Sequence, residues 1–160
     1  MNHQFIHDTP IGELVIEYNI NCLIKISFRN KIKFRTKQFS IKKSMILDKT
    51  IEQLNEYFFD GRKIFTMAYI LDTTPFYKKV LSKVSKIQFG ETKSYKEIAI
   101  ELKNNYAYRA VANANANNPL PIIIPCHRVI KSSEEIGGYG GGIKIKSYLL
   151  NHENKLGHFY

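Results

Sequence analysis

A cysteine followed at once by a histidine and an arginine, Cys126-His127-Arg128, is the part of this sequence best suited to chemistry. Basic neighbours lower the pKa of a thiol, and a histidine can take up its proton, so the triplet predicts a nucleophilic thiolate. A histidine used in this way needs a third group to orient its ring, and Glu153 is the candidate. Spacing alone also allows Cys126 to be an inert core residue and Glu153 a surface one.

The residues before the cysteine predict how it is presented. Pro121 and Pro125 enclose three isoleucines, which is typical of a short buried strand that ends at Pro125 and places Cys126 at its end. Adjacent residues of a strand point to opposite faces, so Cys126 and His127 cannot simply pair. A turn at Cys126 or a bridging water is therefore required.

Five of the six residues from Gly137 to Gly142 are glycines, the exception being Tyr139. Such a loop lets backbone amides and carbonyls come close to a ligand. It is not a phosphate-binding P-loop, because no Gly-Lys-Ser/Thr sequence follows it.

Two helix starts precede this segment. Thr74-Pro75 provides a capping oxygen and a proline at the first helical position, and Ser94 with Glu97 has the spacing of a capping box. Asn104-Asn105 then breaks the second helix, and a helix built almost wholly of Ala and Asn around Arg109 is expected from 107 to 116. The pattern fits a helix-turn-helix, or an ordinary helical hairpin.

The amino-terminal part has a different pattern. Apolar and polar residues alternate from Gly12 to about Phe39, which predicts strands, and a helix is expected from about Thr50 to Phe59, ended by Asp60-Gly61. Residues 62–72 show no clear period and read as a connection. We therefore expect two domains, 1–70 and 71–160.

The chain is strongly basic. Its 160 residues carry 24 Lys and Arg against 14 Asp and Glu, a net charge of +10, divided as +4 over 1–70 and +6 over 71–160. Eight basic residues and no acidic one lie between Lys25 and Lys43, which suits a nucleic-acid stripe or a solvated strand face. The excess charge favours a polyanionic partner, nucleic acid above all, although lysine-rich solubility gives the same composition.

Several classes of protein are excluded. The longest apolar stretch is far short of the roughly 20 residues that cross a bilayer, and the first residues lack the apolar core of a secretory signal. Cys22 and Cys126 form no disulfide framework or zinc cluster, and Cys22 has no expected chemistry. We therefore expect a cytoplasmic protein in a reducing compartment, with no membrane partner, metal or other cofactor.

The motif Pro125-Cys126-His127-Arg128-Val129 closely resembles the O6-alkylguanine-DNA alkyltransferases. The resemblance extends over about 72–157, with these further motifs: Thr74-Pro75-Phe76, Gly90-Glu91-Thr92-Lys93-Ser94-Tyr95, Arg109-Ala110-Val111, Asn118-Pro119, the Gly-rich loop, and Leu149-Leu150 with Glu153. The amino-terminal half is similar more loosely, and it lacks the zinc ligands that some members carry there.

The resemblance implies a mixed α/β (α+β) fold. An amino-terminal domain with a ribonuclease H-like sheet would precede a helical carboxy-terminal domain of the winged helix-turn-helix type. It implies a monomeric DNA repair protein that flips O6-alkylguanine out of double-stranded DNA and transfers the alkyl group irreversibly to its own cysteine. Each molecule would act once and would need no cofactor.

The resemblance also implies roles for single residues. Cys126 would be the acceptor, His127 would deprotonate it through a water, and Glu153 would orient the imidazole. Tyr95 would crowd the phosphate and donate a hydrogen bond to the leaving guanine, and Arg109 would fill the space left by the flipped base. The remaining expected positions are Ala110 and Arg128 at the DNA, and Asn118, Val129, Tyr139, Gly140 and Lys146 around the guanine pocket, with Asn118 holding the turn.

Three other interpretations are weaker. A non-catalytic lesion binder resembles the same domain but lacks the cysteine in the motif, so Cys126 argues against it. A helix-turn-helix regulator would leave the residues from Asn118 to Glu153 unexplained. A thiol hydrolase is disfavoured because Cys and His are adjacent in sequence and no separate upstream His lies in a suitable motif. Gly140 stands where some relatives carry Ser or Ala, which leaves the preference for alkyl size open.

Overall fold

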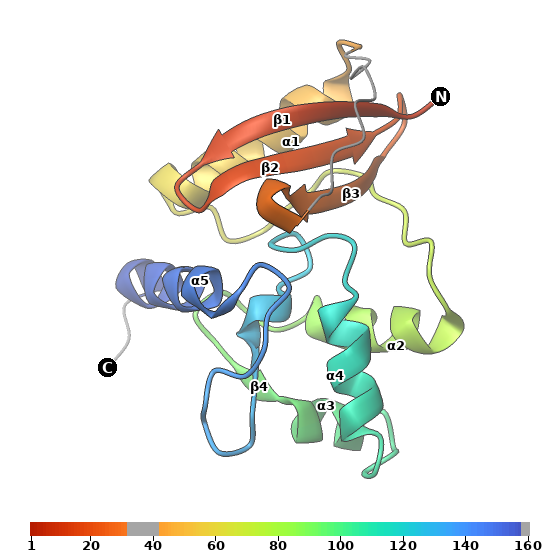
Figure 1. The fold of residues 1–160 in the computed structure, drawn as a ribbon, viewed down its shortest axis with the longest axis vertical. Helices are drawn as coiled ribbons and strands as arrows, with labels where there is room; N and C mark the ends of the chain where they lie inside the picture. Colours follow the sequence, from red (N-terminus) through yellow and green to blue (C-terminus); the bar gives the residue numbers. More distant parts are fainter. Residues whose placement is uncertain (32–41, 158–160) are drawn as a thin grey trace. The chain divides into compact units, whose positions relative to one another are not determined.

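The computed structural model describes residues 1–31 and 42–157, and the chain divides into two compact units, 1–71 and 72–160. Figure 1 shows a sheet with one helix in the first unit and a set of helices around short strands in the second. The expected mixed α/β class is confirmed. No helix in the described part of the chain has the length and apolar character needed to span a membrane.

The first unit is built on an antiparallel sheet of three strands in the order β1-β2-β3, namely β1 (His3–Thr9), β2 (Gly12–Tyr18) and β3 (Leu23–Phe28). The alternation predicted β2 and β3 correctly, but β1 was not expected. Leu14, Ile16 and Tyr18 alternate along β2 and are fully buried, so one face of the sheet forms the core. A 3-10 turn, η1 (Arg29–Lys31), follows β3, and the predicted continuation to Phe39, with three of the eight basic residues of the stripe, lies outside the described residues.

Helix α1 (Met45–Asn55) packs on this sheet and continues as the π-helical turn η2 (Glu56–Asp60). It starts earlier than the predicted start near Thr50, because Ser44 caps it by accepting a hydrogen bond from the amide of Leu47. Its predicted end is confirmed at Gly61, whose φ of 75° is favourable for glycine.

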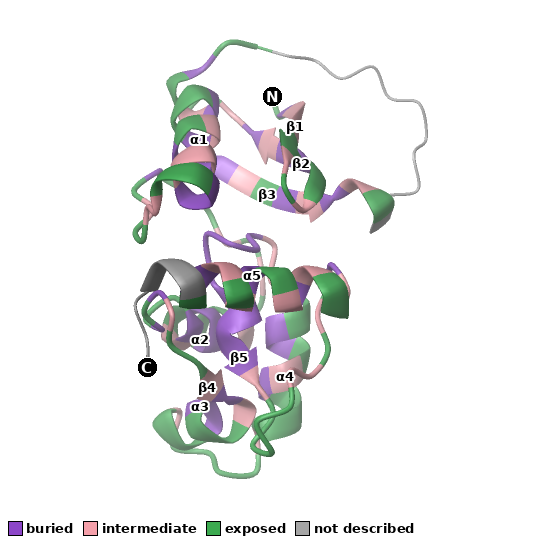
Figure 2. Ribbon diagram, turned by 90° about the vertical axis from the view of Figure 1, so that its left-hand side faces the viewer, coloured by how far each residue is buried: buried purple, intermediate pink, exposed green. Residues whose placement is uncertain are grey.

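Four helices make up most of the second unit: α2 (Pro75–Val84), α3 (Tyr95–Glu101), α4 (Tyr108–Ala116) and α5 (Ile143–Gly157). Thr74 caps α2 and the Ser94–Glu97 capping box opens α3, both as predicted. Two short strands, β4 (Lys93–Ser94) and β5 (Val129–Ile130), pair in parallel. Figure 2 shows buried residues gathered around β5 and exposed ones on the outer sides of the helices.

The segment before Cys126 is a buried turn and not a strand, so that prediction was wrong. Its one ladder contact is an isolated bridge between Pro121 and Ile124, and Ile122 has a φ of 74°. The amide of Ile124 donates to the carbonyl of Leu120, which closes the turn, while the prolines have no amide to offer a neighbouring strand. The run of isoleucines reflects burial rather than strand structure.

Candidate active site

Cys126 begins a short 3-10 helix, η3 (Cys126–Arg128), and is 4% exposed. Its amide donates to the carbonyl of Ile124 at 2.7 Å, and its own carbonyl accepts from Asn115 Nδ2 of α4 at 3.0 Å. The chain therefore turns at Cys126, which is one of the two arrangements that the sequence required for a cysteine next to its base.

The expected partnership of His127 with Glu153 is present in the structure. His127 Nε2 lies 2.6 Å from Glu153 Oε1, and both side chains are almost completely buried. The other ring nitrogen, Nδ1, is also buried and has no hydrogen-bond partner among the described residues. Because Glu153 engages one nitrogen, the other is left to accept a proton.

Glu153 lies at the centre of a buried ion pair that the sequence did not predict. Arg128 donates to both carboxylate oxygens, each at 2.9 Å, and the amide of Gly90 donates at 3.2 Å. Burial alone would raise the pKa of Glu153, but the hydrogen bonds and charges of His127 and Arg128 together lower it well below its ordinary range. The carboxylate is therefore ionised at neutral pH.

Arg128 does not lie where the sequence placed it. It was expected to contact DNA, but it is 5% exposed, and its remaining donor reaches the carbonyl of Ile87 at 2.6 Å. A guanidinium offers donors in a fixed fork that matches a carboxylate, and here the fork is used on Glu153. Arg128 therefore holds Glu153, the residue that contacts His127.

Burial also determines the state of the imidazole. Burial lowers the pKa of His127 below its ordinary value, although the neighbouring Glu153 carboxylate acts in the opposite direction. Arg128 already neutralises much of that carboxylate, so burial prevails. His127 is therefore neutral at pH 7 and available as a base.

The expected low pKa of the Cys126 thiol is wrong in sign. Burial raises the pKa of this thiol above its ordinary value, although hydrogen bonds with Asn118 and Tyr139 and the charge of Lys146 act against it. The arginine two residues further along the chain, Arg128, is engaged by Glu153. Cys126 therefore rests as a thiol, and a base is needed to ionise it when it reacts.

Lys146 of α5 is fully buried beside this site. Its ammonium donates to the carbonyl of Val129 at 2.6 Å and to the carbonyl of Gly138 at 3.2 Å. Desolvation lowers the pKa of Lys146 to about 8, although the Cys126 thiolate would raise it. Lys146 thus joins β5 to the Gly-rich loop and brings a positive charge near the sulfur.

Tyr95, the first residue of α3, lies against the Gly-rich loop. A Cβ added to Gly137, which has a φ of 75°, would lie 3.4 Å from the hydroxyl of Tyr95. Burial and the charge of Cys126 raise the pKa of Tyr95, while its interaction with Asn115 lowers it. Tyr95 is therefore a protonated phenol, able to donate a hydrogen bond.

Asn118 spans the turn before the cysteine. Its Nδ2 donates to the carbonyl of Ile124 at 2.8 Å, and its Oδ1 accepts from the amide of Leu120 at 3.0 Å. This is the geometry required for the role of holding the turn. Tyr139 and Gly140 lie in the Gly-rich loop, which the amide of Gly142 closes by donating to the carbonyl of Tyr139.

Arg109 and Ala110 are exposed near the start of α4, and Arg109 lies on the opposite side of the helix from buried Val111 and Ala114. The Arg109 guanidinium lies 5.8 Å from the centre of the Tyr108 ring, and Tyr108 is itself 44% exposed.

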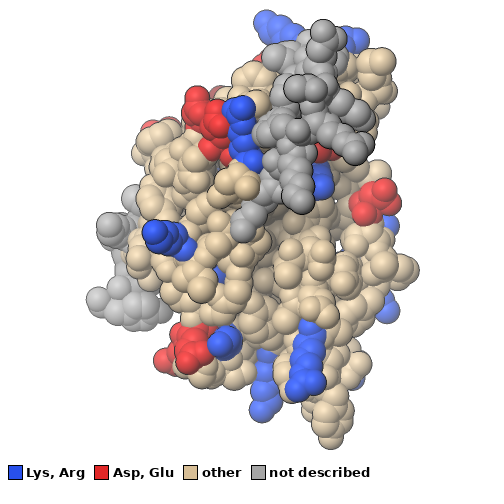
Figure 3. All heavy atoms as spheres, viewed as in Figure 1, with Lys and Arg blue, Asp and Glu red and all other residues tan. Residues whose placement is uncertain are grey.

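Lys and Arg side chains are dispersed over the face drawn in Figure 3 rather than gathered in one block. This suits contact with phosphates more than reading of one sequence.

The sequence also missed some parts of the site. Asn115 donates to the carbonyl of Cys126 and lowers the pKa of Tyr95, and the backbone of Ile87 and Gly90 holds the ion pair. A signal for Asn115 exists, because it is a polar residue on the apolar side of an Ala-rich helix. Within residues 1–31 and 42–157, no group of three or more His, Cys, Asp or Glu side chains has the arrangement of metal ligands.

Comparison with known proteins gives consistent results. The family profile of the 6-O-methylguanine DNA methyltransferase DNA-binding domain matches residues 75–155. The constitutive methylated-DNA–protein-cysteine methyltransferase of Bacillus subtilis is 35% identical, with 96% of each chain covered. A Methanosarcina barkeri protein of the same name is 37% identical, over 93% of this chain and 96% of its own.

Solved structures match as well. The crystal structure of Mycobacterium tuberculosis OGT in complex with DNA has a TM-score of 0.87 at 36% identity, covering 96% of this chain and 94% of its own. An O6-methylguanine DNA methyltransferase from Methanococcus jannaschii has a TM-score of 0.68 at 30% identity, with 93% and 92% covered. These matches extend over both units of the structure, and in the second unit Glu153 contacts the ring of His127, the residue next to Cys126. The chain therefore belongs to the methylated-DNA–protein-cysteine methyltransferase family.

Proposed function

We propose that the protein repairs O6-alkylguanine in double-stranded DNA by moving the alkyl group to Cys126. The observation that carries this proposal is the buried chain of contacts from Arg128 through Glu153 to His127, the residue next to a buried thiol. A thiol of raised pKa reacts only if a neighbour takes its proton, and the neutral His127 has one nitrogen available for it.

In the reaction, the proton of Cys126 passes through a water to His127 Nδ1, and Glu153 stabilises the imidazolium that forms. The Cys126 sulfur then attacks the alkyl carbon from the side opposite O6. The C–S bond forms as the C–O6 bond breaks, and the electron pair of that bond goes to the guanine. Tyr95 donates a hydrogen bond to the guanine ring and so stabilises the charge that develops there.

The thioether product explains why the reaction happens once. A C–S bond of this kind is not hydrolysed, and no residue near Cys126 offers a route back to the thiol. Burial of the sulfur also keeps competing water away from the alkyl group. The protein is therefore both the transfer agent and the final acceptor.

DNA binding is assigned to the same unit. Arg109 and Ala110 are exposed on α4, and the arginine would enter the base stack and fill the space of the extruded guanine. Small residues such as Ala110 allow α4 to come close to a groove. Asn118, Val129, Tyr139, Gly140 and Lys146 then form the surroundings of the flipped base.

The wider organisation follows from this assignment. We place DNA binding and transfer in a carboxy-terminal domain, 71–160, preceded by an amino-terminal α/β domain, 1–70. The site residues all come from one chain, so a monomer suffices. An acceptor that works as a thiol needs a reducing compartment, which favours the cytoplasm.

The test is a mass measurement. After incubation with a duplex that contains O6-methylguanine, the protein should gain the mass of one methyl group on the tryptic peptide with Cys126, in no more than one equivalent. Cys126→Ala should abolish transfer and keep DNA binding. Unmodified protein after full exposure, or more than one turnover, would contradict the proposal.

A further inference from the structure

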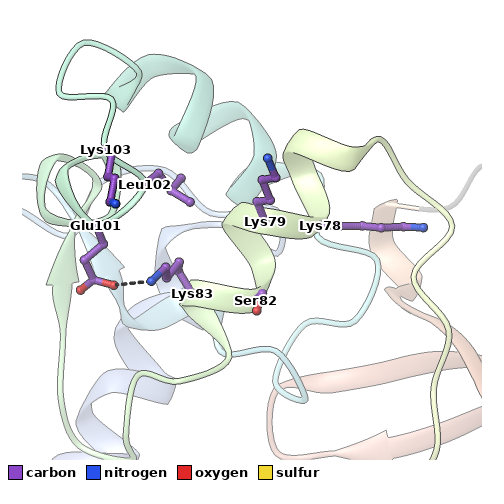
Figure 4. A pocket seen from close by; sticks show the side chains of 7 residues that line it. All are labelled: Lys78, Lys79, Ser82, Lys83, Glu101, Leu102 and Lys103. Carbon is purple, nitrogen blue, oxygen red and sulfur yellow. Dashed lines mark ion pairs between the residues drawn. The ribbon is translucent and has the colours of Figure 1, made fainter.

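A groove between α2 and the end of α3 takes no part in the site described above. Figure 4 shows the residues on its two sides, which are Lys78, Lys79, Ser82 and Lys83 from α2, and Glu101, Leu102 and Lys103 from the end of α3. Its volume is about 470 Å³. The groove is open to solvent along its length, as expected for a surface that receives an extended partner.

The groove carries a surplus of positive charge. Its one acidic residue, Glu101, is already engaged by Lys93, and Lys83 lies 3.9 Å from it. In the part of the chain that the structure describes, no ion pair joins Lys78, Lys79 or Lys103 to an acidic side chain. Lys79 and Lys103 bring ammonium groups to the groove, and Lys78 adds a third on the side of α2 that is turned away from α3 (Figure 4). Together they raise the local potential and attract an anion with several charges.

Lys103 occupies a backbone conformation that does not favour lysine. Its φ is 58°, in the left-handed region, and its amide donates to the carbonyl of Ile100 to end α3. Glycine adopts this conformation at much lower cost. A cation at a helix end interacts favourably with the last carbonyls, but a glycine would close the turn without strain. Lys103 therefore keeps a charge at the edge of the groove against a backbone preference.

The groove also adjoins the element assigned to DNA. Lys103 lies in the turn between α3 and α4, and Arg109 follows near the start of α4. When a duplex places one of its bases near Arg109, the rest of the duplex extends past the turn between α3 and α4 on one side of that base. Lys103 belongs to both this turn and the groove, so the groove begins where the turn does.

We propose that the groove binds the sugar-phosphate backbone of the duplex beyond the flipped nucleotide. This inference rests on the proposed function, because the occupant is the same DNA molecule. Lysine suits the task, since a mobile ammonium contacts phosphates as a point charge and reads no sequence. The groove would lengthen the footprint and strengthen binding to any duplex, damaged or not.

The test compares two triple variants with the same loss of charge. The groove variant is Lys78→Gln/Lys79→Gln/Lys103→Gln, and the control replaces three exposed lysines that lie outside both the groove and the basic segment 25–43, Lys49→Gln/Lys63→Gln/Lys144→Gln. Binding to an undamaged fluorescent duplex is measured by anisotropy over a series of salt concentrations. Each phosphate contact that is lost should reduce the slope of log K against log salt by about 0.9.

We expect the groove variant to lose a slope of about 2 to 3 and to bind at least about tenfold more weakly near 0.1 M salt, while the control keeps a slope close to the wild type. Equal changes in the two variants would show that only net charge matters and would overturn the proposal. A groove variant that binds like the wild type would overturn it too.

A single substitution separates binding from folding. Lys103→Gly should raise the melting temperature, because it relieves the left-handed backbone, and should weaken DNA binding severalfold. Opposite signs in the two measurements cannot arise from general damage to the fold. Unchanged binding in this variant would count against a DNA contact at Lys103.

Transfer from free O6-benzylguanine distinguishes this proposal from the one that it rests on. All variants should alkylate Cys126 with this substrate at the wild-type rate, because no duplex is involved. If the wild type transfers the alkyl group neither from the free base nor from the duplex, the proposed function is wrong. If it transfers and the groove variant keeps the wild-type salt dependence, the groove proposal alone fails.

Discussion

The two units of the chain bury polar side chains of different kinds. Among the described residues of 1–71 these are His3 and the uncharged Ser44, Thr50 and Gln53. Among those of 72–160 they include Arg128, Lys146 and Glu153, together with His127, which contacts Glu153. Both units fold around an apolar core, but in the part of the chain that the structure describes only the second unit buries a carboxylate, a lysine and an arginine.

The neutral groups of the first unit serve the local fold. Ser44 caps α1, Thr50 donates to the carbonyl of Ile46, and Gln53 exchanges two hydrogen bonds with Thr66. Buried charges are different, because burying a charged side chain without a partner of opposite charge costs free energy of folding. Removing one partner of a buried pair therefore destabilises the fold by leaving the other charge unpaired. In the second unit, stability and chemistry therefore depend on the same residues.

The substitution Glu153→Gln should have the largest effect on both stability and transfer. It leaves the Arg128 guanidinium buried without its counter-charge and removes the partner of His127, so we expect a loss of about 3–5 kcal/mol in unfolding free energy and nearly complete loss of transfer. Gln53→Ala in the first unit should cost only about 1–2 kcal/mol and leave transfer unchanged. Urea unfolding and single-turnover assays measure both.

A double variant separates the two effects of Glu153. Arg128→Met/Glu153→Leu replaces the pair with apolar groups and should recover much of the lost stability. Transfer should remain lost, because His127 still lacks its partner. Recovery of transfer along with stability would mean that Glu153 acts only on the fold.

Lys146→Met should have a smaller effect. The methionine fills similar space but leaves the Val129 carbonyl without a donor, which costs about 1–3 kcal/mol, partly offset because no ammonium is buried. Loss of the charge raises the pKa of the Cys126 thiol further, so transfer should slow by about tenfold or more. The exposed Lys144→Met is the control, and it should change neither quantity.

The same contrast separates what the sequence could predict from what it could not. The Thr74 cap, the Ser94–Glu97 capping box and the end of α1 at Gly61 depend on residues within one turn of each other, and all three are present. The three-stranded sheet was predicted in part, because alternation is also local.

Features that depend on distant residues were not predictable in this way. Arg128 is 25 residues from Glu153 in sequence, so nothing nearby showed that its charge would be used there and not on DNA. Burial of Cys126 by the surrounding fold reversed the sign of its pKa shift. The turn before it read as a strand, because apolar residues enclosed by prolines indicate burial but not the path of the chain.

The pH dependence of transfer tests whether the buried charges act as assigned. With free O6-benzylguanine, the rate should fall in acid only below pH 6.5, because the pKa of His127 lies below that ordinary value. It should also decline above about 8, where Lys146 loses its charge. The unfolding free energy should also fall as the pH drops below 6.5. His127 binds a proton at higher pH in the unfolded chain than in the folded one, so acid favours the unfolded state.

A single-turnover pH series on the wild type and on Lys146→Met checks this. The variant should lose the alkaline decline and keep the acid one. A rate that rises steadily through pH 8 would instead be the titration of an unassisted thiol, and it would remove His127 from the mechanism.

The smallest effect is expected at Gly140, which lies in the second unit beside the site but is neither charged nor buried. A Cβ added there would meet only the carbonyl of Ala116, at 3.9 Å, an ordinary contact. Gly140→Ala should therefore change the unfolding free energy by less than about 1 kcal/mol, with a gain favoured because the unfolded chain loses freedom.

Its effect should appear in the choice of substrate. An added methyl group narrows the space beside the Gly-rich loop, so transfer of a benzyl group should slow more than transfer of a methyl group, by a few-fold. Gly138→Ala is the matched control, because a Cβ there meets nothing within 4 Å and only stiffens the same loop. If both variants shift the benzyl-to-methyl ratio equally, loop flexibility and not pocket width sets the preference, and Gly140 does not line the pocket.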